Sequence, residues 1–424
     1  MRVERVGTQT LLAGVAALAA RASTERPRLA RAGDRAAALF VARILVLAAI
    51  TAGAWSLIDP QRAFAATLAV LVVSCPCAFA LAVPAALTRA LTVLARHGVL
   101  VVHPDAIEQL AAATHMVFDK TGTLTHPRLE LERIEVVGME DRRHALALAA
   151  ALARGSRHPA AEAIARAAAS SSPILADAVR AEAGSGLEGV VGGRRLRLGR
   201  ADFALVSPTS PSGFEEAVVL ADHRGPIAAF HLSERVRDGA RAAIDALKDD
   251  GLDIEIASGD AASKVARVAA HLGIARWHAR LRPADKLARL AALRARGACV
   301  IAVGDGINDA PVLAGADVAI ALASGSELAQ ASSDIVLVGG RLGALAEART
   351  IARESLAILR QNQRWALGYN LCVVPLGALG YVPPWLAAIG MSASSLFVVL
   401  NALRIGRRGE RSAHTAVILG EAAA

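Results

Sequence analysis

The chain has 424 residues, of which 54% are hydrophobic and only 3% aromatic, so it is too apolar for a disordered chain and too apolar to lie wholly in water. Its length allows about three folded units at roughly 150 residues each. The 47 lysines and arginines outnumber the 38 aspartates and glutamates, but they are spread along the chain, which argues against a nucleic-acid partner. Four cysteines form no secreted disulfide framework, which favours a reduced, cytosolic setting for the polar part.

Four long apolar runs predict membrane-spanning helices. Leu39 to Ile58 and Phe64 to Leu87 flank a short polar loop, and each reaches the roughly 20 residues that cross a bilayer. Trp365 to Val382 and Trp385 to Leu403 form a second pair, divided by two prolines. Arginines gather at the ends that face the large central stretch, at Arg35, Arg89, Arg96, Arg360, Arg364, Arg404, Arg407 and Arg408. By the positive-inside rule the central stretch is cytosolic and membrane lipid surrounds two helical hairpins.

The central stretch alternates short β-rich runs with helices rich in alanine, leucine and arginine, which favours a doubly wound parallel sheet. The predicted strands are His115–Phe118, Asp253–Ala257, Cys299–Val303, Val318–Leu322 and Ile335–Val338. An insertion from Thr125 to about Glu234 interrupts this alternation. It contains a predicted helix near Ala145–Ala169 and a glycine-rich β segment, Gly184–Gly199. We expect the insertion to form a second lobe.

The heptapeptide from Asp119 to Thr125, Asp-Lys-Thr-Gly-Thr-Leu-Thr, begins where a predicted strand ends, which is where open α/β sheets place catalytic loops. It resembles the phosphorylation motif of P-type ATPases. The resemblance implies that Asp119 attacks the γ-phosphate of ATP and forms an aspartyl-phosphate. It also implies a fold of α-helical membrane hairpins plus an α/β haloacid-dehalogenase-like phosphorylation domain with an inserted α+β nucleotide-binding domain.

A second motif, Gly304 to Pro311, follows another predicted strand and resembles the hinge motif of the same family. By that resemblance Asp305 is a magnesium ligand and Asp309 takes part in cofactor binding. A carboxylate facing Asp119 makes physical sense when a cation separates the two, because hard Mg²⁺ takes oxygen ligands and bridges to phosphate. Asp119 and Asp305 are therefore the predicted magnesium pair.

Two further segments match the family at the phosphorylation site. Ser258-Gly259-Asp260 ends a predicted strand where the family usually has Thr-Gly-Asp, so Ser258 keeps a hydroxyl that can contact phosphate and Asp260 joins the predicted catalytic set. Lys286, in Pro-Ala-Asp-Lys, matches the family's lysine. Its ammonium is expected to neutralise charge on the transferred group.

One position separates a pump from a phosphatase. Soluble phosphatases of the haloacid-dehalogenase superfamily carry a second aspartate two residues after the nucleophile, as the acid/base that hydrolyses the acyl-phosphate. Here that position is Thr121. Without a local general base the phosphoenzyme should persist, as a transporter requires. A soluble-type phosphatase is the alternative that this residue disfavours.

The insertion carries a nucleotide signature. Ser156-Arg157-His158-Pro159 precedes a predicted helix and resembles the His-Pro motif of the heavy-metal branch. The resemblance implies that His158 contacts the adenine, while Gly184 and Gly186 allow close backbone approach. The chain departs from the pattern at Ala153, where many members have a glutamate that helps to hold the adenine.

Cys75-Pro76-Cys77 lies in the middle of a predicted span. Pro76 removes a helical hydrogen bond and clashes with the preceding turn, so the helix must kink or unwind and both sulfurs can reach one cavity. Two thiolates in hydrocarbon are costly without a cation, and soft sulfur selects Cu(I), Ag(I) or Zn(II)-like ions over Na⁺, K⁺ or Ca²⁺. The tripeptide therefore predicts a soft-metal path.

The last two spans favour copper. Tyr369-Asn370 in the third span, with Met391 and Ser395 in the fourth, resemble the signature of the Cu(I)-transporting subclass. Zinc and cadmium pumps place a charged lysine and aspartate in these spans, and none occurs here. The chain is thus predicted to be an ATP-driven Cu(I) exporter of the inner or plasma membrane. The alternatives are a zinc/cadmium-type pump, a soluble-type phosphatase and a non-enzymatic membrane subunit that binds metal.

Relative to the family, we expect an N-terminally truncated chain, because Val3 to Phe40 resembles the tail of the actuator domain and its linker and no Thr-Gly-Glu occurs. The expected partners are ATP, a separate N-terminal half and a cytosolic metallochaperone that delivers Cu(I). The expected parts are an actuator remnant with its linker (1–37), a membrane hairpin (38–95), a phosphorylation domain (96–125 and 235–345), a nucleotide-binding domain (126–234), a linker helix with the second hairpin (346–405) and a tail (406–424).

Overall fold

The computed structural model of the chain describes residues 28–73, 77–137, 140–169, 174–205, 214, 217–305, 310–323 and 333–407. These residues form two compact units. The first contains the described residues up to Lys120 and those from Asp238 onward, and the second, here called the insert, spans Thr121–Arg237. Most of the segment predicted as an actuator remnant, 1–27, lies outside the described residues, and 28–37 belong to a longer helix.

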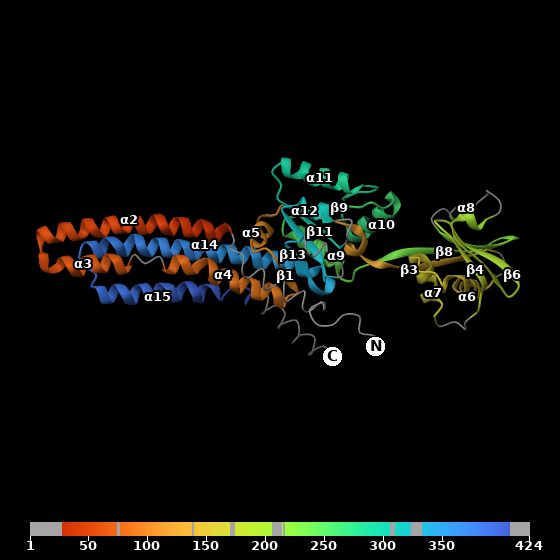
Figure 1. Cartoon of the computed structure of the whole chain (residues 1–424), viewed down its shortest axis with the longest axis horizontal. Coiled ribbons are helices and arrows are strands. Elements are labelled where there is room, and N and C mark those ends of the chain that lie inside the picture. Colours follow the sequence, from red (N-terminus) through yellow and green to blue (C-terminus); the bar gives the residue numbers. More distant parts are fainter. Residues whose placement is uncertain are drawn as a thin grey trace. The chain divides into compact units, whose positions relative to one another are not determined.

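Helices of the first unit lie side by side as a bundle (Figure 1). Their bounds are α2 (Arg28–Ile58), α3 (Pro60–Val73), α4 (Cys77–Arg96), α14 (Gly343–Ala378) and α15 (Pro384–Ala402). Small residues such as Ala69 and Ala90 are fully buried between the helices, while large apolar side chains, among them Leu45, Leu371 and Leu396, are more than half exposed. An apolar surface of this kind is stable in lipid and not in water.

Two of these helices contain segments long and apolar enough to cross a membrane, Phe79–Arg96 and Pro384–Ala402, among the described residues. Two shorter apolar stretches, Ala42–Ile58 and Pro60–Val73, lie in the first predicted hairpin. The predicted run from Phe64 to Leu87 is not one described helix: α3 ends at Val73 and α4 begins at Cys77.

The third predicted span ends earlier than the apolar run suggested. Helix α14 stops at Ala378 rather than Val382, because the Trp55 indole donates a hydrogen bond to the Ala378 carbonyl at 2.9 Å and Gly380 takes a left-handed φ of +74°. At its other end α14 continues back to Gly343 without a break. The predicted linker helix and the third span are therefore one helix of 36 residues.

The first unit also contains a seven-stranded sheet, in the order β1-β13-β12-β11-β2-β9-β10. The strands are β1 (Val99–Val101), β13 (Ile335–Leu337), β12 (Val318–Leu322), β11 (Val300–Gly304), β2 (His115–Phe118), β9 (Asp253–Ala257) and β10 (Arg276–His278). All neighbours pair in parallel except β1 and β13. The predicted doubly wound sheet is confirmed. The two edge strands, of three residues each, were not predicted because they are too short to carry a pattern.

Helices α5 (Asp105–Ala112), α9 (Ala240–Asp249), α10 (Ala262–Leu272), α11 (Pro283–Ala295) and α12 (Ala310–Ala314) cover the sheet. Figure 1 shows α11 and α12 on the same side of it. Their apolar contacts include Leu290, Leu293 and Leu313 from the helices against Val117 and Ala302 from the strands. This packing leaves the carboxyl ends of β2, β9 and β11 as the place where polar residues gather.

A network of ion pairs and hydrogen bonds holds α14 against the α/β part of the first unit. The Arg349 side chain is 2% exposed and donates to the Leu110 carbonyl at 2.9 Å, and it also pairs with Asp250, which binds Arg353 as well. Breaking a buried pair of this kind leaves an uncompensated charge. The helix that carries part of the predicted metal site is thus tied to α5 and to the end of α9, two of the helices that cover the sheet.

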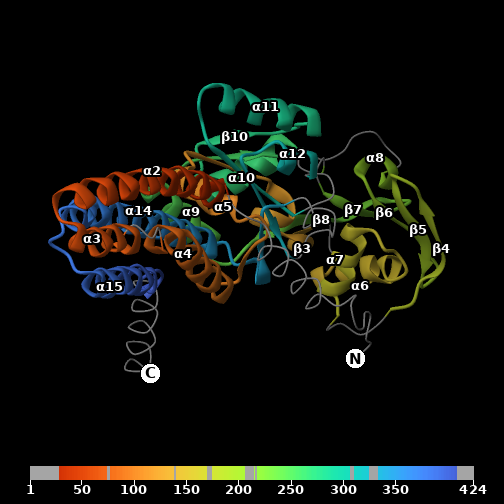
Figure 2. The same ribbon diagram turned by 60° about the vertical axis from the view of Figure 1, so that its left-hand side comes forward.

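The insert is a six-stranded antiparallel sheet in the order β3-β8-β7-β6-β5-β4. Its strands are β3 (Thr125–Val136), β4 (Asp177–Glu182), β5 (Gly186–Val191), β6 (Arg194–Gly199), β7 (Val218–Asp222) and β8 (Gly225–Val236). Figure 2 shows α6 (Arg142–Ala153) and α7 (Pro159–Ala167) together on one side, and α8 (Ala201–Ala204) packs elsewhere against β6 and β7. The single helix predicted near 145–169 is wrong: Pro159 begins a new helix and His158 caps it.

Candidate functional site

Asp119 stands one residue past the carboxyl end of β2. Its backbone N–H donates to the Val303 carbonyl at 2.9 Å, so the pairing of β2 with β11 extends through the aspartate. The Lys286 ammonium, from the first turn of α11, lies 2.6 Å from the Asp119 carboxylate, and the side chains are 10% and 12% exposed. Water screens such a pair weakly, so Lys286 both orients the carboxylate and places a positive charge beside it.

A second ion pair involves the next residue along the chain. The Lys120 side chain is 2% exposed, and its ammonium lies 2.9 Å from the Asp260 carboxylate. The Ser258 hydroxyl donates to the same carboxylate at 3.1 Å and accepts the Asp260 N–H at 3.2 Å. Sequence reasoning gave Lys120 no role of its own, since nothing in the motif names its partner. A phosphate contact from Ser258 stays a prediction, because its hydroxyl is engaged with Asp260 here.

Asp305 follows β11, and Val303 of that strand pairs with Phe118 of β2. Asp119 and Asp305 therefore leave neighbouring parallel strands at the same edge of the sheet. Two carboxylates fit Mg²⁺, which binds proteins through one or two carboxylates plus phosphate oxygens rather than in a full protein cage. The described part of the chain holds no group of three or more His, Cys, Asp or Glu side chains suited to a metal. Asp309 lies outside the described residues.

Within the insert, the return strand β8 fixes the loop that carries Thr121. The Thr121 hydroxyl donates to the Glu234 carboxylate at 3.5 Å, and the buried Thr125 hydroxyl donates to its other oxygen at 2.5 Å. Arg237 adds a hydrogen bond of 2.5 Å to the Gly122 carbonyl. Sequence analysis missed Glu234 and Arg237, whose only signal was a run of charges at the end of the predicted insertion.

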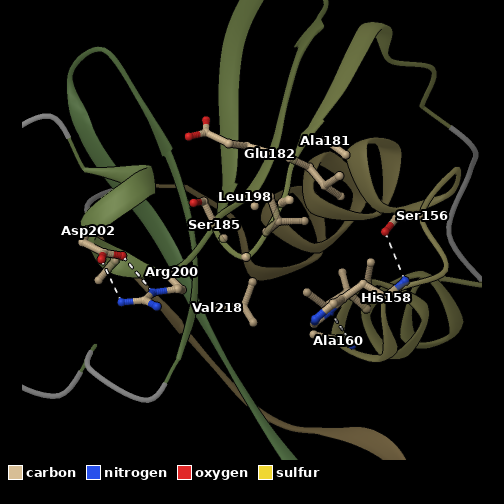
Figure 3. A pocket seen from close by; sticks show the side chains of 18 of the residues that line it. Ser156, His158, Ala160, Ala181, Glu182, Ser185, Leu198, Arg200, Asp202 and Val218 are labelled. Atoms are coloured by element: carbon tan, nitrogen blue, oxygen red, sulfur yellow. Dashed lines mark hydrogen bonds and ion pairs between the residues drawn. The ribbon is translucent and has the colours of Figure 1, made fainter.

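The insert holds a cavity of about 1000 Å³, lined by α7, the β4–β5 turn and the end of β6. That is the size range of sites that enclose a small-molecule ligand. His158 lies on one side, and on the other the Arg200 guanidinium binds both oxygens of Asp202, at 3.1 and 2.9 Å (Figure 3). Because both members of that pair are about two-thirds exposed, it contributes little to stability. The cavity is formed mainly by backbone and small side chains.

His158 is held in one orientation at the start of α7. The ring Nδ1 accepts the Ala160 N–H at 3.3 Å, and the backbone N–H of His158 donates to the Ser156 hydroxyl at 3.2 Å. An Nδ1 that accepts a hydrogen bond assigns the ring hydrogen to Nε2. The ring lines the cavity and can offer Nε2–H to a ligand's acceptor atom.

The two predicted glycines differ in what they do. Gly184 has a left-handed φ of +76° with open space around it, so a turn at the cavity wall requires it. A Cβ on Gly186 would lie 2.5 Å from the Leu198 carbonyl oxygen and 2.7 Å from the Phe203 ring. Packing against Leu198 and Phe203 therefore requires a glycine at position 186, and its predicted role in backbone approach to the ligand stays a prediction. Ala153 is 1% exposed in the apolar core.

In the helical bundle, the predicted metal residues of α14 and α15 lie on inward-facing stripes. Along α15, Ala387, Ser394 and Val398 are buried, and the half-buried Met391 and Ser395 belong to the same stripe. The stripe of α15 packs against α3, α4 and α14.

Along α14, Tyr369 and Asn370 are half-buried. A Cβ on Gly390 would lie only 2.5 Å from the Tyr369 hydroxyl oxygen, so this glycine leaves room for the phenol next to Met391. Tyr369 also packs on a cluster that contains Val73 and Ala387. Val73 is two residues before Cys75, which itself lies outside the described residues, as does the side chain of Cys77.

Comparison with known proteins decides the family. The model of haloacid dehalogenase-like hydrolases matches residues 113–317. A solved zinc-transporting PIB-type ATPase in its E2.Pi state is 30% identical, with a TM-score of 0.79 over 94% of this chain and 67% of that one. The chain belongs to the heavy-metal P-type ATPases.

Comparison with two curated members of these ATPases shows how much of a relative's length the chain covers. The nitrogen fixation protein FixI of Bradyrhizobium diazoefficiens is 40% identical over 95% of this chain and 55% of its own length. A copper-exporting P-type ATPase of Mycobacterium tuberculosis is 36% identical over 95% and 54%. The chain spans about half the length of these curated relatives. The similar ATPases include a zinc transporter and a copper exporter, so the comparisons show the family but not which metal this chain transports.

Proposed function

We propose that this chain carries the phosphorylation, nucleotide and membrane parts of an ATP-driven exporter of Cu(I), working through an aspartyl-phosphate at Asp119. The observation that carries the proposal is the Lys286 ammonium, 2.6 Å from the Asp119 carboxylate at the end of a buried parallel strand. That arrangement supplies a nucleophile with a fixed positive charge beside it. The sheet unit lies on the cytosolic side in this proposal, and the bundle crosses the cell membrane.

The chemistry is an in-line displacement. A carboxylate oxygen of Asp119 attacks the γ-phosphorus of ATP, the new P–O bond forms, and the bond to the β–γ bridging oxygen breaks with release of ADP. Lys286 stabilises the charge that develops on the transferred group, while the Lys120–Asp260 pair holds the chain next to the nucleophile. Asp119 and Asp305 would hold Mg²⁺, which would supply further neutralisation of the negative charge on the phosphate.

The residue after Lys120 favours a lasting phosphoenzyme. Thr121 offers no carboxylate, and its hydroxyl is committed to Glu234, which also binds Thr125. A hydroxyl of ordinary pKa is a poor general base near neutral pH. A soluble-type phosphatase, which needs rapid hydrolysis at this point, is therefore the weaker proposal.

Copper is proposed on the chemistry of the membrane residues. Cys75 and Cys77 supply soft thiolates, and Met391, with Tyr369 beside Gly390, adds a soft thioether on the inward stripe of α15. No charged residue occurs between Trp365 and Leu403, so a hard or divalent ion has no counter-charge in that hairpin. The likeness to a zinc-transporting structure favours zinc as the second candidate.

Metal-dependent labelling tests the proposal. The purified chain is incubated with γ-labelled ATP and Mg²⁺, with Cu(I), with Zn²⁺ or with neither, and acid-stable, hydroxylamine-labile label is counted. We expect Cu(I) to raise the label. Stimulation by Zn²⁺ alone would assign the chain to zinc. Phosphate-ester hydrolysis without stable label would favour the phosphatase, and metal binding with no label would favour a non-enzymatic subunit.

A further inference from the structure

A buried carboxylate lies in the contact between the sheet and α11. Glu255, in the middle of β9, has a side chain only 2% exposed. Its strand neighbours are Val117 of β2 and Arg276 of β10. Because side chains alternate along a strand, Glu255 shares a face with Ala257, which packs on α11. A charge at this position needs a partner.

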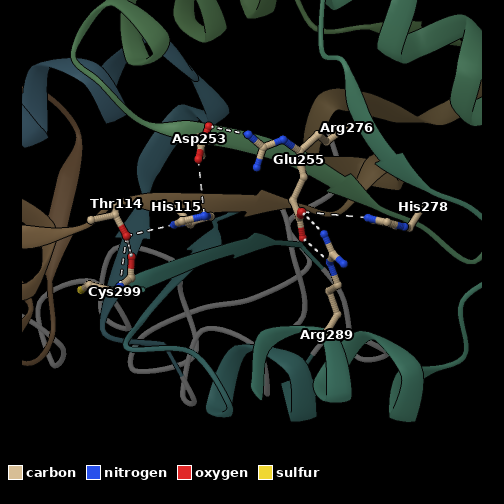
Figure 4. A network of polar contacts seen from close by, with 8 residues as sticks. All are labelled: Thr114, His115, Asp253, Glu255, Arg276, His278, Arg289 and Cys299. Atoms are coloured by element: carbon tan, nitrogen blue, oxygen red, sulfur yellow. Dashed lines mark hydrogen bonds and ion pairs between the residues drawn. The ribbon is translucent and has the colours of Figure 1, made fainter. Parts of the chain in front are cut away.

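That partner is Arg289 of α11. Its Nε and Nη2 donate to the two Glu255 carboxylate oxygens at 3.1 and 2.8 Å (Figure 4). The hydrogen bond to Glu255 raises the pKa of Arg289, so the guanidinium stays charged. His278 of β10 faces the same carboxylate, with Nε2 at 4.0 Å. Among the residues drawn in Figure 4, Arg289 is the one that joins a helix to the sheet.

Stability alone does not explain this pair. Replacing a buried ion pair with apolar side chains of similar volume is often neutral or stabilising, and the best-attested use of such pairs is to fix register. A bidentate fork restrains both the rotation of a helix and its position along its axis. Here the restrained helix carries Lys286, three residues before Arg289.

Lys286 depends on that register. Its long stem has four rotatable bonds, so a contact of 2.6 Å to Asp119 requires a well-placed backbone. The start of α11 is fixed independently, because the Asp285 carboxylate accepts the Arg282 N–H at 2.9 Å and the Leu281 N–H donates to the Ser258 carbonyl at 3.0 Å. Lys286 thus lies between an anchored helix start and the Arg289 fork.

We propose that Glu255 and Arg289 are positioning residues for phosphoryl transfer: their ion pair sets the register of α11 that places the Lys286 ammonium on Asp119. The proposal rests on the proposed function, because it matters only when Asp119 is phosphorylated. Displacement of a catalytic group by about 1 Å can cost on the order of 10²-fold in rate. The nucleotide cavity belongs to the insert, so ATP affinity should not change.

The test uses the full chain and the double variant Glu255→Met with Arg289→Met, which removes both charges and leaves an apolar contact. We expect the single-turnover rate of phosphoenzyme formation to fall by about 10- to 100-fold at an unchanged KM for ATP. For Arg289→Lys, which keeps the charge and loses the bidentate guanidinium contact, the same rate should fall by roughly 3- to 10-fold. The control is Arg294→Met on the same helix, which breaks the partly exposed pair with Asp317, a residue just before β12, and should leave the rate unchanged.

Each outcome of this test either supports or overturns the positioning role of Glu255 and Arg289. A double variant that labels at the wild-type rate, or an Arg294→Met variant that falls equally, overturns the positioning role. A matching rise in the KM for ATP overturns it too, since the defect would then not be local to α11. Should the double variant fail to fold, Arg289→Lys decides alone, and an unchanged rate there overturns the inference. Absence of label on the wild-type chain is a different result, which rejects the proposed function itself.

Discussion

The proposed phosphorylation site and the proposed nucleotide cavity are built on opposite physical principles. At the first, buried charges are paired in advance: Lys286 with Asp119, and Lys120 with Asp260. The cavity of the insert has no such buried pair among its described lining residues, and its one charged pair, Arg200 with Asp202, is largely exposed. The sheet edge is organised by electrostatics and the cavity by shape.

This difference indicates what each site would contribute to the proposed phosphoryl transfer. A transferred phosphoryl group carries changing charge, which preorganised charges stabilise at no cost of reorganisation during the step. An adenine ring is neutral and flat, so in the proposed function a cavity of suitable size with one oriented donor, His158, would be enough to hold it. Changes at the first site should act on rate, and changes at the second on affinity.

The largest effect is expected for Lys286→Met. Loss of the ammonium removes the charge beside Asp119 and should lower the rate of phosphoenzyme formation by about 10²- to 10³-fold with little change in the KM for ATP. Rapid-quench labelling over a range of ATP concentrations measures both. Lys248→Met is the control, since it removes an ammonium on α9 that donates to the Gly273 carbonyl and not to Asp119. A change confined to KM would break the proposed division between the two sites.

Gly186→Ala tests whether shape organises the cavity. The added Cβ would meet the Leu198 carbonyl oxygen and the Phe203 ring, so we expect a loss of about 2 kcal/mol in the stability of the insert. Thermal unfolding of the full chain checks this. Gly155→Ala, which meets nothing within 4 Å, should have almost no effect. Equal stability of the two variants would show that the wall is not close-packed.

His158→Ala should raise the KM for ATP about tenfold and leave the maximal rate of phosphoenzyme formation unchanged, because one hydrogen bond to the ligand is lost far from the reacting atoms. His144→Ala, on the exposed part of α6, serves as the control. A fall in the maximal rate with constant KM would place His158 in the chemistry and contradict the comparison.

The smallest effect concerns a charge in the insert that serves stability only. Burial raises the pKa of Asp222, but the hydrogen bonds from Arg194 and from the Arg224 N–H outweigh it, so the pKa lies below its ordinary value of 3.8. The stabilisation is therefore complete above that value and is lost as pH falls through the lower pKa of the folded protein. We expect Asp222→Asn to cost about 1 kcal/mol at pH 7 and less at acid pH, with KM unchanged. A cost that grows toward acid pH would contradict the sign.

The sequence predicted the elements whose signals are local. The parallel strands and the strand-end position of Asp119 follow from patterns of a few residues, whereas the break between α6 and α7 at His158 was missed. The pairs Lys120–Asp260 and Arg289–Glu255 join residues 140 and 34 positions apart, so their partners depend on how the sheet folds. The sequence alone likewise did not show why packing requires a glycine at position 186, since Leu198 and Phe203 come from other elements. The early end of α14 at Ala378 depends on Trp55 of a distant helix.

Labelling of the Asp119→Asn variant tests the central claim most directly. The amide keeps the shape of the carboxylate but is not a nucleophile, so the account predicts that acid-stable label from γ-labelled ATP disappears while nucleotide binding to the insert stays at the wild-type level. Both readouts come from the same preparation of the full chain. Persistent, hydroxylamine-labile label on the variant would place the nucleophile at another residue and contradict the account.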